Sequence, residues 1–287
     1  MNITSLGYRT DLMLLRLSGS ELTDKGEYVV VRTPANPTYW WGNFLLFRTP
    51  FAPGDAKARL ATFQQEFPLA EHVAFGIDST DGVVAAGAEL GAVGLELERN
   101  TVMTATQVKE PARPNDVSEY RFIRGDDGWE QLVELNLAAS TLDLPGYEEF
   151  NRRRTEAERA LVEAGHGQWF GAFDQGRLQA SLGLVTDGTG VARFQHVQTH
   201  PDDRGRGIAG TLVHRASEYG LKELEAHTLV MVADPNTPPS GSTARSDSPT
   251  PKSSCSSRNH LRTAGRPTDE ARHSTPTTNG AVIPHRF

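Results

Sequence analysis

The sequence predicts an α/β (α+β) fold made of two domains and a disordered C-terminal tail. The chain has 287 residues, about twice the ~150 residues of a typical domain. Strand-like and helix-like segments follow one another up to residue 235, with a polar, proline-bearing interruption at 111–116. From residue 236 on, Ser, Thr and Pro replace most large apolar side chains, so this segment cannot offset its ordering entropy. We therefore expect domains at 1–112 and 118–235 and a disordered tail at 236–287.

The first domain combines strand-like runs with one helix. The runs are rich in β-branched, aromatic and leucine residues and are separated by Gly, Pro and Asn clusters. The helix is expected at 54–67, where apolar residues recur at helical spacing after Pro53. Trp40 and Trp41 lie in a strand-like run, where packing is a more common role than lining a pocket. The expected strands are 11–17, 27–32, 40–48, 72–78 and 94–106.

The second domain follows a different order. Its elements are a strand at 119–123, a helix from Asp127, a helix at 149–164, strands at 168–173, 179–186 and 191–200, a helix from Ile208 to Tyr219, and a strand at 227–233. Asp127 and Glu130 have capping-box spacing. Short Gly-containing links between the three middle strands specify antiparallel hairpins. Gly220 is expected just past the end of the last helix.

Composition excludes several function classes. The formal net charge is −7, and the first 235 residues hold 22 basic and 33 acidic side chains, which argues against nucleic acid as a partner. No apolar run approaches the ~18 residues of a membrane span, and the N-terminus lacks a signal-peptide layout. We expect a cytoplasmic protein without a membrane partner. The single cysteine, Cys255, excludes an intrachain disulfide and a multi-cysteine metal site, so no metal is expected.

One loop has the chemistry of an anion site. The segment from Arg204 to Ala209, Arg-Gly-Arg-Gly-Ile-Ala, leads into an amphipathic helix. Backbone N–H groups at a helix start lack partners, and the helix dipole adds positive potential there, so phosphates bind well. Gly205 and Gly207 let the chain turn tightly and approach a ligand closely. The side chains of Arg204 and Arg206 add positive charge.

This loop and the order of elements around it resemble the GNAT N-acetyltransferase superfamily, whose loop pattern is Arg/Gln-x-x-Gly-x-Gly/Ala. The resemblance covers 119–236 and is strongest at 195–213. It implies a GNAT-like mixed sheet with helices on both faces and acetyl-CoA as co-substrate. It also implies direct acetyl transfer to a small-molecule or peptide amine, without a protein nucleophile. The acceptor itself and the oligomeric state are left open.

The resemblance also implies which residues contact the co-substrate. Backbone groups of the strand end would bind the pantetheine arm, and one N–H there would stabilise the oxyanion. The glycine-rich loop would hold the pyrophosphate. The implied set is Val197, Gln198, Thr199, Arg204, Gly205, Arg206, Gly207, Ile208, Ala209 and Gly210.

Two other interpretations of the loop stay open. Gly205, Gly207 and Gly210 match the dinucleotide fingerprint, and Asp234 lies 24 residues beyond Gly210. That fold requires an apolar parallel strand immediately before the first glycine, whereas this strand is half polar and is followed by four intervening residues. The loop is also compatible with a structural turn that binds nothing.

Acid–base groups are less clearly indicated. Attack requires a neutral amine, and therefore a base or a water relay. Strand alternation places His196, Gln198 and His200 on one face, so either histidine is a candidate, although a single structural hydrogen bond is the more common role. Glu148 and Glu149 lie at a helix start, where carboxylates favour the helix in any protein.

The C-terminal part of the family pattern is missing. The family usually closes with an Asn-x-x-Ala helix, whose tyrosine protonates the departing thiolate, and two further strands. Asn236 begins such a passage and is a third catalytic candidate, but Pro- and Ser-rich sequence follows and no tyrosine occurs after Tyr219. The tail is either a natural disordered segment or the product of a shifted reading frame near 236–247. The alternative function is accordingly a catalytically impaired acyl-CoA-binding or interaction protein.

The first domain has a weaker resemblance of the same kind. Residues 85–103 resemble the closing helix and strands of a second, degenerate GNAT unit. This part lacks the Arg-x-x-Gly-x-Gly/Ala loop, so no coenzyme is expected in it. The resemblance implies a tandem arrangement in which the first domain shapes the acceptor pocket.

Overall fold

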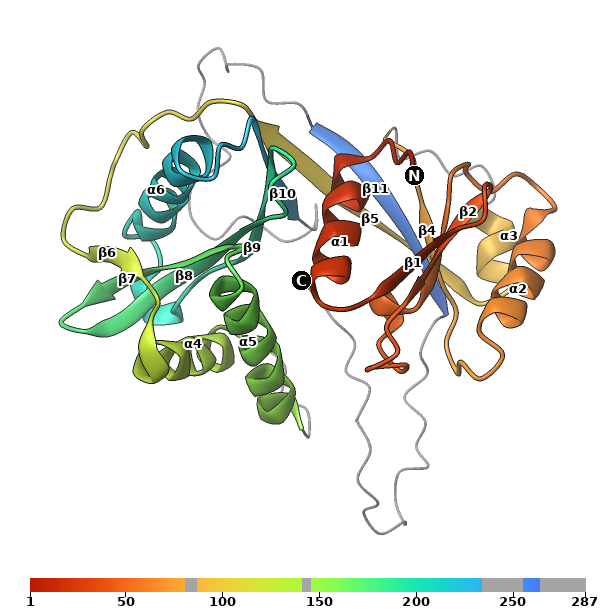
Figure 1. Ribbon diagram of the computed structural model, residues 1–287, viewed down its shortest axis with the longest axis horizontal. Coiled ribbons are helices and arrows are strands. Elements are labelled where there is room, and N and C mark those ends of the chain that lie inside the picture. The colour runs from red at the N-terminus through yellow and green to blue at the C-terminus, as the bar shows by residue number, and fades with distance from the viewer. Residues whose placement is uncertain (81–86, 141–145, 234–254, 264–287) are drawn as a thin grey trace, which may run out of the picture. The chain divides into compact units, whose positions relative to one another are not determined.

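The computed structural model describes residues 1–80, 87–140, 146–233 and 255–263 (Figure 1). It contains two compact units, Met1–Thr101 with Ser256–Arg286, and Val102–Cys255. The division falls inside strand β5 (Leu95–Ala105), earlier than the 112–118 boundary expected from the proline-bearing segment. The domain limits therefore stay a prediction. Within the described part of the chain, no helix is both long and apolar enough to cross a lipid bilayer.

The first unit packs helices on both faces of a sheet. Its elements are α1 (Leu6–Leu17), β1 (Glu21–Asp24), β2 (Tyr28–Arg32), η1 (Trp40–Gly42), β3 (Phe44–Phe47), α2 (Asp55–Glu66), β4 (Ala74–Ile77), α3 (Gly87–Ala92) and β11 (Cys255–Thr263). Neighbouring strands pair in the order β1-β2-β3-β4-β11, and only the β3–β4 pair among them is parallel. Side chains alternate between two cores: Tyr8 and Leu12 of α1 pack against Val29 and Val31, whereas Phe63 of α2 packs against Val30.

The strand expected at 11–17 is wrong, because α1 occupies Leu6–Leu17. Ser5 caps this helix by accepting a hydrogen bond from the backbone N–H of Tyr8. The leucine-rich run is compatible with the period of a strand and with that of a helix. The helix forms because Tyr8 and Leu12, four residues apart, then both pack against the sheet. Trp40 and Trp41 pack as expected: Trp40 stacks on His72 with ring centroids 5.6 Å apart, and Trp41 contacts Phe44 edge-on.

One strand interrupts the tail that was expected to be disordered. β11 pairs antiparallel with β4, with Asn259 opposite Ile77 and Arg262 opposite Ala74. Backbone hydrogen bonds to β4 form irrespective of side-chain type, so the missing hydrophobic alternation concealed this strand from sequence reasoning. The remainder of 236–287 lies outside the described residues.

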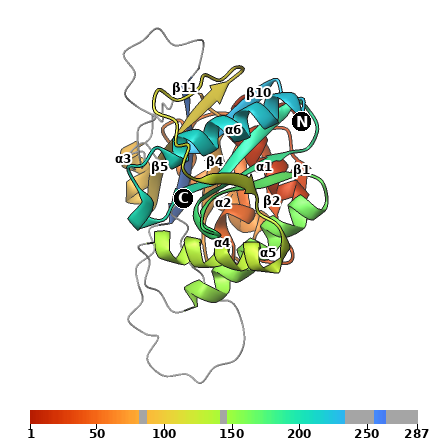
Figure 2. The ribbon, with the colours of Figure 1, turned by 90° about the vertical axis from the view of Figure 1, so that its left-hand side faces the viewer.

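The second unit is a mixed sheet with helices on both faces, which confirms the predicted fold class. Its elements are β6 (Glu119–Phe122), α4 (Gly125–Ala139), α5 (Tyr147–Glu163), β7 (Gly167–Asp174), β8 (Arg177–Thr186), β9 (Val191–Thr199), η2 (Pro201–Asp203), α6 (Ile208–Lys222) and β10 (Thr228–Ala233). Strands β6 to β9 form an antiparallel meander and β10 is parallel to β9. Helices α4 and α5 cover one face and α6 covers the other (Figures 1 and 2).

Two local details of this unit differ from the prediction. α4 begins at Gly125, so Asp127 lies in its first turn and is not the cap. Gly220 lies inside α6 instead of after its end. A Cβ at Gly220 would lie 2.7 Å from Leu184 and 2.9 Å from Leu229, so this glycine allows the helix to approach β8 and β10 closely.

Candidate functional site

The site begins where β9 loses its regular pairing. The parallel register with β10 ends at Arg193 opposite Val230, although β9 continues to Thr199 and β10 to Ala233. On the other side, the register with β8 shifts between Ser181 and Gly183. This irregularity includes His196, whose φ of 45° is unusual for a residue other than glycine. Beyond Arg193, one edge of β9 is therefore not paired with β10.

After β9 and η2, the chain turns into α6 through the glycine-rich loop. Gly205 and Gly207 both have φ of 77°, in the left-handed region that favours glycine. A Cβ at Gly205 would meet no atom within 4 Å. A Cβ at Gly207 would lie 2.9 Å from the backbone carbonyl oxygen of Arg113. The two glycines are thus needed for the same turn, but only Gly207 is closely covered by another segment.

The loop presents unpaired donors. Within the described ranges, no group accepts a hydrogen bond from the backbone N–H groups of 205–210. These N–H groups include those of the first turn of α6, where the helix dipole favours an anion. The side chains of Arg204 and Arg206 are exposed beside them. This combination suits a phosphate group.

Asp203 anchors the glycine-rich loop through buried hydrogen bonds. It is 1% exposed and accepts hydrogen bonds from Arg177 and Gln179, both at 2.8 Å, and from Arg206 at 3.1 Å. Burial raises the pKa of Asp203, but the hydrogen bonds from Arg177 and Gln179 and the charge of Arg206 outweigh burial and leave the pKa below its ordinary value. Asp203 is therefore an ionised anchor for the loop.

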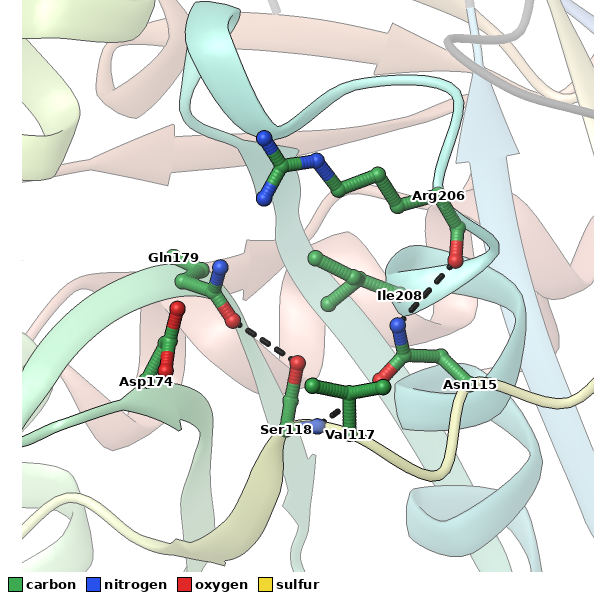
Figure 3. Close-up of a pocket in the computed structure, with 7 residues that line it drawn as sticks. All are labelled: Asn115, Val117, Ser118, Asp174, Gln179, Arg206 and Ile208. Atoms are coloured by element: carbon green, nitrogen blue, oxygen red, sulfur yellow. Dashed lines mark hydrogen bonds between the residues drawn. The ribbon is translucent and has the colours of Figure 1, made fainter.

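The proline-bearing segment, which the sequence indicated only as a boundary, lies against this loop. Asn115 donates from its backbone N–H to Thr211 Oγ1 at 2.8 Å and from Nδ2 to the carbonyl oxygen of Arg206 at 3.1 Å. Ser118 donates to Gln179 Oε1 at 2.7 Å. Asn115, Ser118, Gln179 and Arg206 are among the residues that line a pocket of about 330 Å³. Figure 3 shows the lining side chains. The lining residues are Asn115, Val117, Ser118, Asp174, Gln179, Arg206 and Ile208.

The structure separates the three residues predicted at the end of β9. Val197 packs against the core on the α6 face. Gln198 contacts Asn136 and Ser181 on the α4 side. Thr199 is buried, and its hydroxyl has no hydrogen-bond partner among the described residues. Alternation along the strand thus places one unsatisfied hydroxyl next to the loop.

The catalytic candidates have different surroundings. His200 accepts a hydrogen bond from the backbone N–H of Asp202 at 3.3 Å and caps η2, which is a structural role. His196 lies on the opposite side from α6, with its Nε2 3.2 Å from Glu158 Oε1. Asn236 lies outside the described residues. The structure therefore favours His196 over His200 as a group that could exchange protons.

Sequence reasoning missed Glu158. It lies on the buried face of α5 with Asn151 and Thr155, at helical spacings of seven and three residues. Burial raises the pKa of Glu158 to about 7, against the opposing charge of Arg154. The available signal was a helix with too few apolar residues to fill its buried face, which indicates a polar interior.

The remaining acidic candidates are structural. Glu148 and Glu149 lie in the first turn of α5 and form exposed ion pairs with Arg152 and Arg153, as their position predicted. Among the described residues, no group of His, Cys, Asp and Glu is placed to hold a metal ion.

Comparison with known proteins identifies the class of this domain. Residues 129–239 match the model of the acetyltransferase (GNAT) family. This part of the chain is a GNAT acetyltransferase domain, and the predicted resemblance is confirmed. No curated protein has a significantly similar sequence.

Solved structures show the same fold across both units. A functionally unknown conserved protein from Staphylococcus epidermidis is similar with a TM-score of 0.64 at 7% identity, over 85% of this chain and 94% of that one. A GCN5-related N-acetyltransferase from Kribbella flavida reaches a TM-score of 0.59 at 13% identity, over 91% and 97%. A tandem GNAT protein from the clavulanic acid biosynthesis pathway reaches 0.50 at 14% identity, over 76% and 72%. The fold of the chain is therefore similar to the folds of these proteins.

The same geometry disfavours the dinucleotide interpretation. β9 is antiparallel to β8 inside a meander, and η2 separates it from Gly205. A dinucleotide site requires a parallel strand that leads directly into the first glycine.

Proposed function

We propose that this protein transfers an acetyl group from acetyl-CoA to an amine. The observation that carries the proposal is the glycine-rich loop before α6, where unpaired backbone N–H groups of 205–210 lie beside the exposed side chains of Arg204 and Arg206. Placement of this loop in a GNAT acetyltransferase domain supports acyl-CoA as its ligand. The proposal adds that the acyl group is acetyl and that the acceptor is an amine.

The residues present fit coenzyme A. The N–H groups of 205–210 are oriented by a turn that only glycine adopts easily, so they suit a pyrophosphate. The edge of β9 beyond Arg193 is free of β10 pairing and suits the amide groups of a pantetheine arm, as a peptide adds to a sheet edge. The unpaired hydroxyl of Thr199 supplies one more polar group between the two.

The reaction follows from this placement. The amine attacks the thioester carbonyl carbon, the C–N bond forms and the C–S bond breaks, so coenzyme A leaves as its thiol. A backbone N–H at the β9 edge would stabilise the negative charge that develops on the carbonyl oxygen. The two substrates react directly, so the protein contributes orientation and proton transfer.

A second candidate is an acyl-CoA-binding protein without turnover. One feature of the sequence favours this second function: no tyrosine follows Tyr219 that could protonate the departing thiolate. Loss of a general acid costs about 10²–10⁴ in rate.

Calorimetry tests acetyl-CoA binding, which both candidate functions require. Wild-type protein should bind acetyl-CoA and should not bind NAD, and the variant Arg204→Ala/Arg206→Ala should bind at least tenfold more weakly because two cations beside the phosphates are lost. A variant of exposed arginines elsewhere, Arg152→Ala/Arg153→Ala, is the control. Thiol release with a panel of amines then separates enzyme from binding protein. Unchanged affinity in the Arg204/Arg206 variant would show that the loop is not the phosphate site.

A further inference from the structure

Strand β9 contains one extra residue relative to its neighbour β8. The register between the two strands is interrupted at Leu182 of β8. Opposite this single residue lie two residues of β9, His196 and Val197. Two residues opposite one define a β-bulge. His196 leaves the extended conformation, with a φ of 45°, so the bulge depends on a left-handed backbone at a position that is not glycine.

The bulge decides which face of the sheet each side chain of β9 takes. Before the bulge Phe194 packs on the α6 face, and after it Val197 packs on the same face. In a regular strand these two side chains, three residues apart, would lie on opposite faces, because side chains alternate. The extra residue thus keeps Val197 in the apolar core. It also turns the imidazole of His196 toward α5, where its Nε2 lies 3.2 Å from Glu158 Oε1.

Two side chains from different elements hold the imidazole of His196. Glu158 approaches it from the buried face of α5, and Trp169 of β7 stacks on the ring with centroids 6.5 Å apart. Trp169 is itself fixed over Gly183 of β8, where a Cβ would lie 2.4 Å from the indole ring. A residue other than glycine keeps a left-handed backbone only when its surroundings hold it there. We call Glu158 and Trp169 the His196 clamp.

The carboxyl group of Glu158 is explained by this contact and not by packing. Glu158 is 7% exposed, and a buried carboxyl group is unfavourable unless a partner compensates it. Its Oε1 has two nitrogen neighbours, His196 Nε2 at 3.2 Å and Arg154 Nε at 3.6 Å. Arg154 lies one turn earlier on the same helix, so among these contacts only the one with His196 joins α5 to the bulge.

The bulge lies where β9 and β10 separate. Their parallel register ends at Arg193 opposite Val230, and both strands continue beyond this point. His196 follows Arg193 by three residues and directly precedes Val197–Thr199, the segment that the proposed function assigns to the pantetheine arm. A ligand pairs with a strand edge only where the N–H and C=O groups of that strand point toward it. The backbone conformation of His196 sets the direction of the groups that follow.

We propose that the His196 clamp holds the β9 bulge in its left-handed conformation and thereby positions the backbone of Val197–Thr199 for acyl-CoA. The proposal rests on the proposed function, which assigns this segment to the coenzyme. Glu158 is then a positioning residue that acts through His196. A protein in which the bulge is only partly populated binds its ligand more weakly, in proportion to the competent fraction.

The first test compares three substitutions of His196 by calorimetry with acetyl-CoA. Each removes the imidazole, but glycine adopts a left-handed backbone freely, asparagine adopts it more readily than most residues, and alanine does so least. The affinity should therefore fall about tenfold in His196→Ala and stay close to that of wild type in His196→Gly and His196→Asn. Equal affinities in the alanine and glycine variants would overturn the proposal, because the backbone conformation would then not decide binding.

A double-mutant comparison tests Glu158. Glu158→Leu keeps a side chain of similar volume on α5 but removes the carboxyl group, and it should lower the affinity for acetyl-CoA by about fivefold or more. In the His196→Gly background the same substitution should leave the affinity unchanged, since glycine requires no clamp. Any loss of stability should instead lower the Tm in both backgrounds. Glu156→Leu, at an exposed position of the same helix, is the control. An equal loss of affinity in both backgrounds would overturn the clamp.

Hydrogen exchange without acetyl-CoA separates this proposal from the proposed function. Amides of a peptide spanning 194–200 should exchange faster in Glu158→Leu than in wild type or Glu156→Leu, because a bulge without its clamp opens more often. Unchanged exchange in Glu158→Leu would overturn the clamp. Failure of the wild-type protein to bind acetyl-CoA would instead refute the proposed function, and the exchange result would still decide whether the clamp holds the bulge.

Discussion

The substitution Gly207→Ala tests the geometry of the phosphate loop most directly. At φ of 77° an alanine costs roughly 1–2 kcal/mol relative to glycine. Its Cβ would also lie 2.9 Å from the carbonyl oxygen of Arg113, tighter than ordinary van der Waals contact by about half an ångström. The segment that contains Arg113 and Asn115 is held against the loop, because Asn115 donates hydrogen bonds to the carbonyl oxygen of Arg206 and to Thr211 Oγ1. The loop must shift, and its N–H groups with it.

A well-aligned hydrogen bond to a charged phosphate is worth about 1.5–3 kcal/mol, so losing one through misalignment should raise the Kd for acetyl-CoA by roughly 10- to 100-fold. Calorimetry measures the affinity, and thermal unfolding checks that the variant is folded. Gly205→Ala is the matched control, since Gly205 has the same φ of 77° but its Cβ would meet no atom within 4 Å. It should lose similar stability and less affinity. A folded Gly207→Ala variant that binds acetyl-CoA as wild type does would refute the reasoning.

Three further substitutions probe the supports of the site. Asp203→Asn should destabilise the protein most at neutral pH. The pKa of Asp203 is lowered in the folded state, so the carboxylate stabilises the fold above the ordinary pKa of 3.8, and this stabilisation is lost as the pH falls through the folded-state pKa. The urea midpoints of variant and wild type should therefore converge in acid. Gly183→Ala would place a Cβ 2.4 Å from the ring of Trp169, and the overpacking should cost about 1–3 kcal/mol, seen as a lower Tm; an unchanged Tm would contradict the packing. Asn115→Ala removes the bond to the Arg206 carbonyl and should weaken acetyl-CoA binding severalfold in calorimetry, while equal affinity would show that this segment does not hold the loop.

Local sequence patterns specify much of the second unit. The helical and strand periods, the Gly-containing hairpin links and the Arg204–Ala209 loop are local patterns, and the structure contains the corresponding elements. The left-handed conformation of Gly205 and Gly207 is likewise a local property of glycine. The prediction is wrong where a local pattern is ambiguous: the leucine-rich run at 11–17 was expected to be a strand and belongs to helix α1.

Tertiary structure decided the contacts between distant segments. Neither the cover that Asn115 places on the loop, 91 residues before Arg206, nor the approach of Glu158 to His196 follows from any local spacing. β11 was hidden for the same reason, since its partner β4 lies far earlier in the chain. Local periodicity reports which face of an element is buried. Which polar groups meet on that face depends on how the helices pack on the sheet, and this packing brings a carboxylate from α5 to an imidazole on β9.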